Sequence, residues 1–314
     1  MNNWSAVLSR EEKTAFSLRA LYAENGYEKY RMSKFEEYDV YARNKDFLVS
    51  ENVITFTDLD GRLLAMKPDV TLSIIKNARL SADEVMKVYY HENVYRVAKG
   101  TRSYQEIMQA GLECLGAVDE TTLLEVLSLA VKSLDCIAES NVLELSHTGI
   151  VGGILNACAL SDEGKKTVVE ALARKDLSGI RAMAVQEGLD EMKTALLEKL
   201  TTIYGGIDDV EGALDGLCVD DATTSSVADF KGVLNGLKAL GLSGKIRVDF
   251  SVAGNRKYYS GVAFQGYVEG IPTGVLSGGQ YDGLMRSMGK KGKAVGFAVY
   301  LDELKRQRYR WPAK

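Results

Sequence analysis

The spacing of apolar positions changes along the chain and marks its expected secondary structure. At the start, apolar residues recur every three or four positions after Ser9 and Glu12, which stand in the order of a capping box. Gly26 follows as a stop signal. This pattern predicts a helix over residues 9–25.

An alternating pattern follows in VITFTDLDGRLLAMKP, residues 53–68. Asp60 and Gly61 stand between its two alternating halves and predict a β-hairpin. Pro68 ends the second strand, and Asp69 can cap a short helix after it.

In the next part of the chain the spacing of apolar residues switches between the strand period and the helix period. Two strands are predicted at 85–97 and 105–114, then a helix at 120–138, a strand at 141–147 and a helix from about Gly149.

A long helical stretch separates this part from the end of the chain. Residues 160–240 are predicted to be almost wholly helical, with Lys and Glu pairs on exposed faces, and they resemble an insertion. Strand signals then return in KIRVDF, KYYSGVAFQGYV, TGVLSGG and KAVGFAVY. The simplest architecture is α+β, an antiparallel sheet flanked by helices, assembled from both ends of the chain and interrupted by a helical insertion.

Composition narrows the class of protein. The chain is 46% hydrophobic with a formal net charge of −4, and its charges are interspersed, so no basic stripe suggests nucleic acid. No signal sequence is present, and no run of about eighteen apolar residues suggests a membrane span. We therefore expect a cytoplasmic protein.

Residues suited to metals or common cofactors are sparse. The four cysteines are too far apart for a metal clip and lie in apolar contexts typical of buried thiols. The two histidines, His91 and His147, are more typical of structural positions than of catalytic ones. Neither GxxxxGK[ST] nor GxGxxG occurs. We expect no metal and no cofactor.

One strand pair combines three types of polar group. Gln109 and Glu113 share a strand face by parity, and Arg96 lies on the preceding strand. An arginine, an amide and a carboxylate together can bind a zwitterion. On spacing alone, a solvated sheet face with a salt bridge is the better-supported interpretation.

Three other segments are ambiguous in the same way. Asp69 and Thr71 after a proline are equally well explained by helix capping. Tyr258 and Tyr259 are expected on opposite faces of a strand, one in the core and one free to line a pocket. SGGQYDGL, residues 277–284, is typical of a strand-to-helix turn.

Four segments in this order resemble the catalytic domain of histidyl-tRNA synthetase, namely LLAMKPDVT, NVYR…QEIMQAGLECLG, NRKYYSGVAFQGY and SGGQYDGL…AVGFAVYLDEL. The resemblance spans nearly the whole chain. It implies a class II aminoacyl-tRNA synthetase-like domain over residues 1–314, interrupted at about 160–240, that dimerises through its N-terminal region.

The resemblance fails where the synthetase places arginines that serve ATP and catalysis. Ser103 and Gln105 occupy such positions in motif 2, Gly254 replaces the catalytic arginine, and Glu303 replaces the arginine of motif 3. A carboxylate there reverses the charge presented to a triphosphate. The resemblance therefore implies that no catalytic residue of adenylation is retained.

The amino-acid half of the site is better matched. The positions that resemble histidine-binding residues of the synthetase are Asp69, Thr71, Arg96, Gln109, Glu113, Tyr258 and Tyr259. By this resemblance Asp69 and Thr71 hold the α-amino group of histidine. Glu113 and Tyr259 hold its imidazole ring, and Gln109 contacts its backbone groups.

The printed sequence ends soon after motif 3, so we expect no anticodon-binding domain and no tRNA partner. This pattern resembles the regulatory-subunit family of ATP phosphoribosyltransferase. The resemblance implies a non-catalytic homodimer within a larger hetero-oligomer. It implies assembly with the short-form catalytic subunit, activation of that subunit in histidine biosynthesis, and feedback inhibition by L-histidine.

Two alternatives remain open from sequence. A truncated histidyl-tRNA synthetase paralogue could still form an aminoacyl adenylate if Arg102 or Arg256 replaced the lost arginines. A free-standing histidine-binding domain could serve another partner.

Overall fold

The computed structural model divides the chain into two compact units. The structure describes residues 7–48, 53–80, 83–97, 103–254 and 258–308. The first unit combines residues 1–141 with residues 267–314, and the second comprises residues 142–266. Arg102 and Arg256 lie outside the described residues. No helix in the described part is long and apolar enough to cross a membrane.

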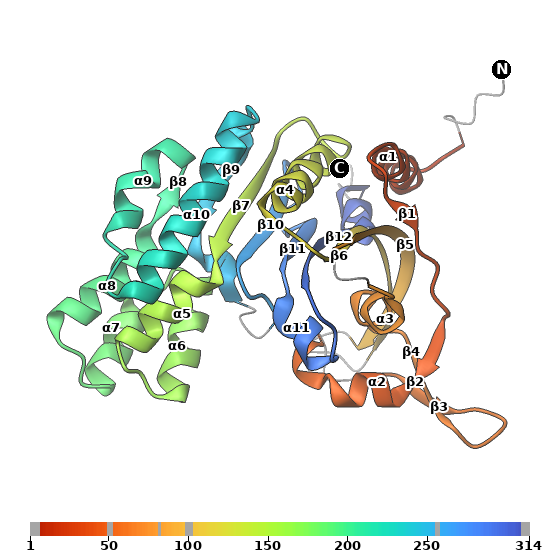
Figure 1. The fold of residues 1–314 in the computed structure, drawn as a ribbon, viewed down its shortest axis with the longest axis horizontal. Helices are drawn as coiled ribbons and strands as arrows, with labels where there is room; N and C mark the ends of the chain where they lie inside the picture. Colours follow the sequence, from red (N-terminus) through yellow and green to blue (C-terminus); the bar gives the residue numbers. More distant parts are fainter. Residues whose placement is uncertain (1–6, 49–52, 81–82, 98–102, 255–257, 309–314) are drawn as a thin grey trace, which may run out of the picture. The chain divides into compact units, whose positions relative to one another are not determined.

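The sheet of the first unit is built from both ends of the chain, as predicted. Its strands, in spatial order, are β1 (Glu28–Lys29), β5 (Val85–Val97), β6 (Tyr104–Gly116), β12 (Lys293–Tyr300) and β11 (Leu276–Gln280). β5 and β6 pair along their whole length, and β12 pairs antiparallel with β6. β1 is parallel to β5, so the all-antiparallel expectation was wrong at this edge. Figure 1 shows the blue C-terminal strand β12 beside the yellow β6.

Two helices cover one face of this sheet. They are α1 (Arg10–Glu24) and α4 (Glu120–Asp135). The predicted capping box of α1 is present, with both Ser9 and Glu12 engaged. The Tyr22 ring of α1 lies 6.0 Å from the rings of Tyr89 and Phe297 on the sheet, and its hydroxyl bonds Ser133 of α4 at 3.0 Å. This face is therefore filled by core packing.

The first unit also contains a small second sheet and several shorter helices, and the last of these, at residues 301–308, packs against α1. These elements are the small sheet β2 (Phe35–Glu37), β4 (Leu63–Met66) and β3 (Thr55–Thr57), the helices α2 (Tyr38–Arg43), α3 (Thr71–Asn77) and α11 (Asp282–Ser287), and the 3-10 helices η2 (Lys45–Phe47) and η5 (Leu301–Arg308). The predicted hairpin is confirmed, because β3 and β4 pair antiparallel around Gly61, whose φ is +81°. The Asp58 carboxylate accepts from two turn amides.

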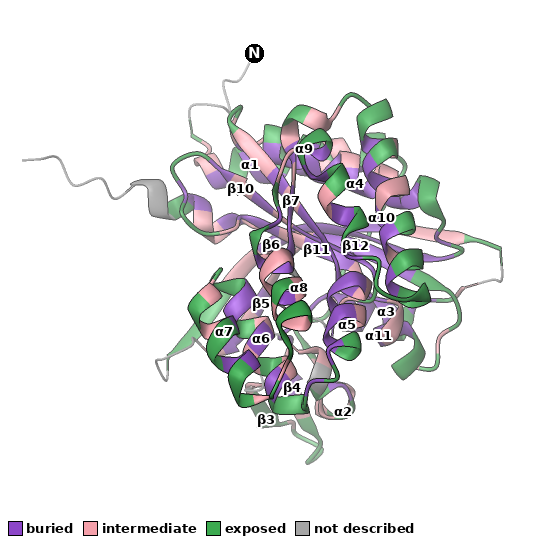
Figure 2. Cartoon of the chain, turned by 90° about the vertical axis from the view of Figure 1, so that its left-hand side faces the viewer, coloured by how far each residue is buried: buried purple, intermediate pink, exposed green. Residues whose placement is uncertain are grey.

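The second unit is mostly helical. Its elements are β7 (Asn141–His147), α5 (Thr148–Ala157), α6 (Asp162–Ala173), α7 (Leu177–Gln186), α8 (Glu191–Thr202), β8 (Tyr204–Gly205), α9 (Ile207–Asp215), α10 (Asp221–Ala239), η3 (Ser243–Lys245), β9 (Ile246–Asp249), η4 (Phe250–Gly254) and β10 (Val262–Val268). Its strands lie in the order β10-β7-β9-β8, and β7 is parallel to β9. Figure 2 shows helices with one buried side and one exposed side, as amphipathic spacing requires.

Some side chains of the second unit depart from expectation. Cys218 is exposed, whereas Cys158 is buried as the apolar context suggested.

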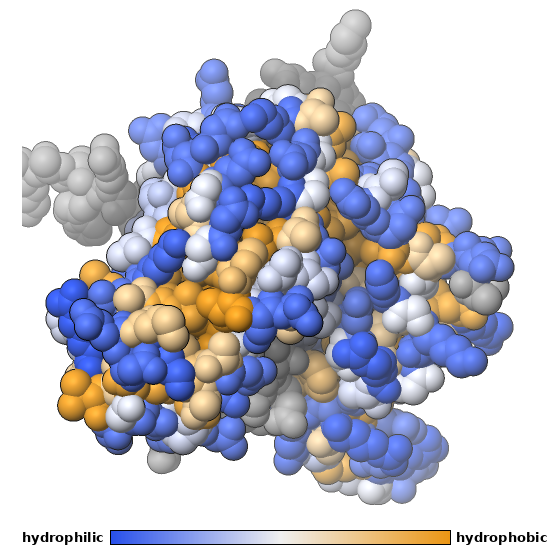
Figure 3. All heavy atoms as spheres, turned by 60° about the vertical axis from the view of Figure 1, so that its left-hand side comes forward, coloured by the Kyte–Doolittle hydropathy of each residue, from blue (hydrophilic) through white to orange (hydrophobic). Residues whose placement is uncertain are grey.

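Burial lowers the pKa of His147 to about 4, so its ring is neutral at pH 7. Figure 3 shows apolar side chains gathered within a largely polar surface, and the exposed apolar residues include Met192 and Val219.

Candidate functional site

The other face of the first unit's sheet carries a buried carboxyl group, Glu113. Its side chain is 2% exposed and lies in the middle of β6. The Thr71 hydroxyl donates to one carboxylate oxygen at 2.7 Å, and the Tyr281 hydroxyl donates to the other. Because a carboxylate offers about four lone-pair sites, two hydroxyl donors leave capacity for a ligand.

The burial of Glu113 changes its acidity. Desolvation raises its pKa from 4.5 to about 8, and the nearby charge of Asp69 raises it further, against lowering by the two hydroxyl donors. The carboxyl group is therefore mostly protonated at neutral pH. A ligand that carries positive charge lowers this pKa when it binds, because it favours the carboxylate form.

Asp69 and Arg96 lie beside this group at the start of α3. The Arg96 Nε donates to the Pro68 carbonyl at 2.8 Å, and its Nη2 lies 4.0 Å from the Asp69 carboxylate. The other Asp69 oxygen accepts from the Leu72 amide at 3.0 Å, so Asp69 satisfies an amide in the first turn of α3, although the N-cap residue is Val70. Burial raises the Asp69 pKa, although the Arg96 charge and the backbone donors oppose this. Both side chains are about nine-tenths buried.

Strand register places Gln109 on the same face. Gln109 is 3% exposed and pairs with Glu92 of β5 and Tyr300 of β12. Two positions nearer Glu113 along β6, Gly111 faces Tyr90. Strand parity therefore aligns Gln109, Gly111 and Glu113 as predicted.

Two glycines are needed for the side chains at this face to fit. A side chain at Gly296 would place its Cβ 1.7 Å from a Glu113 carboxylate oxygen and 2.5 Å from the Leu112 carbonyl. A Cβ at Gly111 would lie 2.6 Å from the Tyr90 hydroxyl. The room for Glu113 and Tyr90 therefore depends on the missing Cβ atoms.

The structure places the tyrosine pair differently from the prediction. Tyr258 and Tyr259 precede β10, which begins at Val262, so they do not lie on opposite faces of a strand. Their rings contact each other with centroids 5.0 Å apart at 73°. The prediction was wrong because the turn through Ser260 and Gly261 interrupts the extended pattern. Both tyrosines belong to the second unit, whereas the other five predicted residues lie in the first.

Several polar residues of this face were missed from sequence. Tyr281 lies just after SGGQ, in a segment whose sequence indicates only a strand-to-helix turn. Lys67 is 1% exposed and pairs with Glu92 at 2.5 Å. Parity along β5 could have placed Glu92 beside Arg96, but nothing local indicates that Lys67 is buried.

The positions that the resemblance aligns with ATP-binding or catalytic arginines hold Ser103, Gln105, Gly254 and Glu303 in this chain. Glu303 accepts a hydrogen bond of 2.6 Å from the Thr273 hydroxyl. Ser103 directly precedes β6, Gln105 is its second residue, and Gly254 ends η4. In the described part of the chain, no three His, Cys, Asp or Glu side chains are grouped so as to hold a metal ion.

These groups together can bind a small zwitterion. Buried carboxyl groups suit an ammonium or ring N–H, and a guanidinium or amide suits a carboxylate. The low polarity of the surroundings strengthens each contact.

Comparison with known proteins gives consistent results. The family model described as Histidyl-tRNA synthetase matches residues 6–304. An ATP phosphoribosyltransferase regulatory subunit from Bacillus mycoides is 28% identical over 298 residues, covering 93% of this chain and 71% of that protein.

Two solved structures share the fold. A structure titled ATP phosphoribosyltransferase regulatory subunit/histidyl-tRNA synthetase, from Bacillus halodurans, gives a TM-score of 0.84 at 21% identity, covering 99% of this chain and 81% of its own. A chain of the ATP phosphoribosyl transferase (HisG:HisZ) complex from Thermotoga maritima gives 0.70 at 20% identity, covering 91% of this chain and 96% of its own. The class II synthetase-like α+β fold is thereby confirmed.

Proposed function

The chain belongs to the histidyl-tRNA synthetase family, and we propose that it serves as the regulatory subunit of a short-form ATP phosphoribosyltransferase. In this role it assembles with the catalytic subunit, activates it and transmits inhibition by L-histidine. The regulatory subunit from Bacillus mycoides supports the proposal by similarity along 93% of the chain. The fold shared with a chain of the Thermotoga maritima complex is consistent with such an assembly.

The observation that carries the proposal is the contrast between two parts of the synthetase-like site. The buried groups suited to an amino acid are present and close together, with Thr71 bonded to Glu113 and Arg96 beside Asp69. Glu303, in contrast, puts a carboxylate where the resemblance calls for an arginine. Without cationic groups to stabilise the developing charge, adenylation loses its main electrostatic support. Binding of an effector without catalysis fits this combination.

L-histidine is the proposed effector, held at the sheet face of the first unit. Asp69 and Thr71 hold its α-amino group, Arg96 and Gln109 its carboxylate and backbone groups, and Glu113 its imidazole ring. The raised Glu113 pKa supports this assignment, because a carboxyl group that readily exchanges protonation state suits an imidazole partner.

Activation is tested by titrating a short-form catalytic subunit with this protein and measuring the rate of phosphoribosyl transfer to ATP. The proposal expects the rate to rise with added protein until the two are stoichiometric. Histidine is expected to reverse that rise. A rate that stays at its basal value with a cognate catalytic subunit contradicts the proposal.

A further inference from the structure

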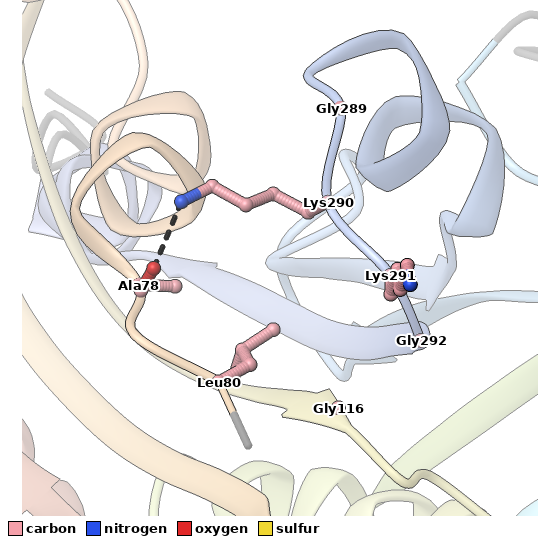
Figure 4. A pocket seen from close by; sticks show the side chains of 7 residues that line it. All are labelled: Ala78, Leu80, Gly116, Gly289, Lys290, Lys291 and Gly292. Carbon is pink, nitrogen blue, oxygen red and sulfur yellow. Dashed lines mark hydrogen bonds between the residues drawn. The ribbon is translucent and has the colours of Figure 1, made fainter. Parts of the chain in front are cut away.

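A basic loop borders a cavity of about 440 Å³ in the first unit, apart from the residues assigned to histidine. The loop connects α11 to β12, and the cavity is lined by Ala78, Leu80, Gly116, Gly289, Lys290, Lys291 and Gly292. Figure 4 shows Lys290 reaching from this loop to the end of α3, with Leu80 and Gly116 on the other side. Three of the seven lining residues are glycines, which have no side chain beyond the backbone.

The loop geometry depends on glycine. Gly289 and Gly292 have φ values of +68° and +99°, which favour glycine over other residues. A Cβ at Gly292 would lie 2.6 Å from the Gly116 carbonyl oxygen. The loop backbone therefore lies directly against the end of β6 at Gly292, where a side chain would clash. At Gly289 an added Cβ meets nothing within 4 Å, and only the positive φ favours glycine.

Lys290 fixes the loop to the helix. Its ammonium donates to the Ala78 carbonyl at 2.8 Å and to the Lys76 carbonyl at 3.3 Å, at the C-terminal end of α3. A cation at this end of a helix is stabilised by the last carbonyl groups. Two neutral carbonyl groups thereby hold the Lys290 ammonium at the edge of the cavity.

Hydrogen-bond donors that lack an acceptor lie beside Lys290. Within the described residues, the Lys291 ammonium has no hydrogen-bond or ion-pair partner, and the amides of Lys291 and Gly292 donate to no backbone carbonyl. Arg79 lies between the lining residues Ala78 and Leu80, and Lys293 follows Gly292, so both add positive charge near the loop. Backbone and side-chain hydrogen bonds lower the pKa of Asp119, and the charge of Lys293 lowers it further. Two successive free amides beside ammonium groups form an arrangement suited to an oxyanion.

We propose that this loop is a binding site for the phosphate groups of a small molecule. The amides of Lys291 and Gly292 and the Lys291 ammonium contact the phosphate oxygens, and Lys290 positions the loop. The proposal stands independently of the histidine site and of any catalytic partner.

The test is calorimetric titration of the full chain with pyrophosphate, inorganic phosphate, ATP and citrate. Pyrophosphate is expected to bind, and Lys291→Gln to weaken it about tenfold, as loss of one charge-assisted contact implies. The matched control is Lys166→Gln, which removes an equally exposed lysine from α6 of the second unit and should bind as the wild type does. Thermal melting of both variants confirms that they fold.

The ligands separate the possible sources of binding. ATP and pyrophosphate that bind alike, and that both weaken in Lys291→Gln, support a site for phosphate groups alone. ATP binding without pyrophosphate binding overturns the proposal, because contacts outside the loop then dominate. Citrate binding as tight as pyrophosphate also overturns it, since charge attraction alone is then sufficient. Equal weakening of pyrophosphate binding by Lys291→Gln and by Lys166→Gln also overturns the proposal.

Discussion

Folding transfers the Glu113 carboxyl group from water into the protein interior, where two hydroxyl groups donate hydrogen bonds to it. Its pKa of about 8 means that the folded protein keeps a proton that the unfolded chain loses near pH 4.5. Because the folded state binds more protons between these values, stability falls as pH rises through this window. The contribution of Glu113 is therefore fully present below the lower pKa and lost as pH passes the upper one.

The Glu113→Gln variant isolates this contribution. Between pH 5 and 8 the wild type is expected to lose up to about 1.4 kcal/mol of unfolding free energy per pH unit from this one group. The variant lacks the titrating proton, so its stability should decline less steeply. Urea unfolding of both proteins across this range measures the difference, and parallel curves would show that Glu113 titrates normally.

Gly296 tests whether room for the Glu113 side chain is essential. Gly296→Ala forces a methyl group against Glu113 and the Leu112 carbonyl, and overpacking of this kind typically costs about 1–3 kcal/mol. The control is Gly212→Ala in α9, where an added Cβ meets nothing within 4 Å. That change should be neutral or stabilising, because alanine favours a helix. Equal melting temperatures for the two variants would contradict the packing described at Glu113.

At the scale of elements, Tyr22 is one of the buried residues of α1 and links this helix to α4 and to the sheet. Tyr22→Phe removes the hydrogen bond to Ser133, and the loss is expected to lower the unfolding free energy by about 1 kcal/mol. Tyr104→Phe is the control, because Tyr104 is 71% exposed. Denaturant unfolding compares the two. An effect of Tyr104→Phe as large as that of Tyr22→Phe would argue against this hydrogen bond as the cause.

Local sequence signals were sufficient for most elements. The capping box at Ser9 and the turn before Gly61 are encoded within a few residues, so periodicity and turn chemistry predicted both. β1 was missed because two residues carry no period, and its parallel pairing depends on β5, which comes much later in the chain. The tyrosine pair was misplaced because strand parity was extended past a turn.

The candidate site was only partly visible from sequence for a related reason. Parity placed Gln109 and Glu113 on one face, since both lie on a single strand. Tyr281 and Thr71 reach Glu113 from segments far away in the chain, and that proximity is a tertiary property. Polar spacing alone favoured a solvated face, whereas the structure buries these side chains within the first unit.

For the whole molecule, the proposal requires that the protein bind histidine without converting it to an aminoacyl adenylate. Pyrophosphate exchange into ATP is expected to stay at background with every amino acid, because Glu303 supplies negative charge where adenylation needs positive charge. Authentic histidyl-tRNA synthetase serves as the positive control in the same assay. Exchange that depends on histidine and exceeds background would identify an adenylating paralogue instead.

The central claim is that histidine acts through the Glu113 site to regulate a catalytic partner. Coupling between the two sites is reciprocal, and a variant that binds histidine more weakly needs a higher histidine concentration for the same inhibition. The most direct measurement is the histidine inhibition curve of phosphoribosyl transfer by the assembled complex, with wild type, Glu113→Gln and the exposed control Glu170→Gln. Glu113→Gln is expected to activate normally but to need about tenfold more histidine, as loss of one strong polar contact implies. Inhibition curves that coincide for all three proteins would contradict the account.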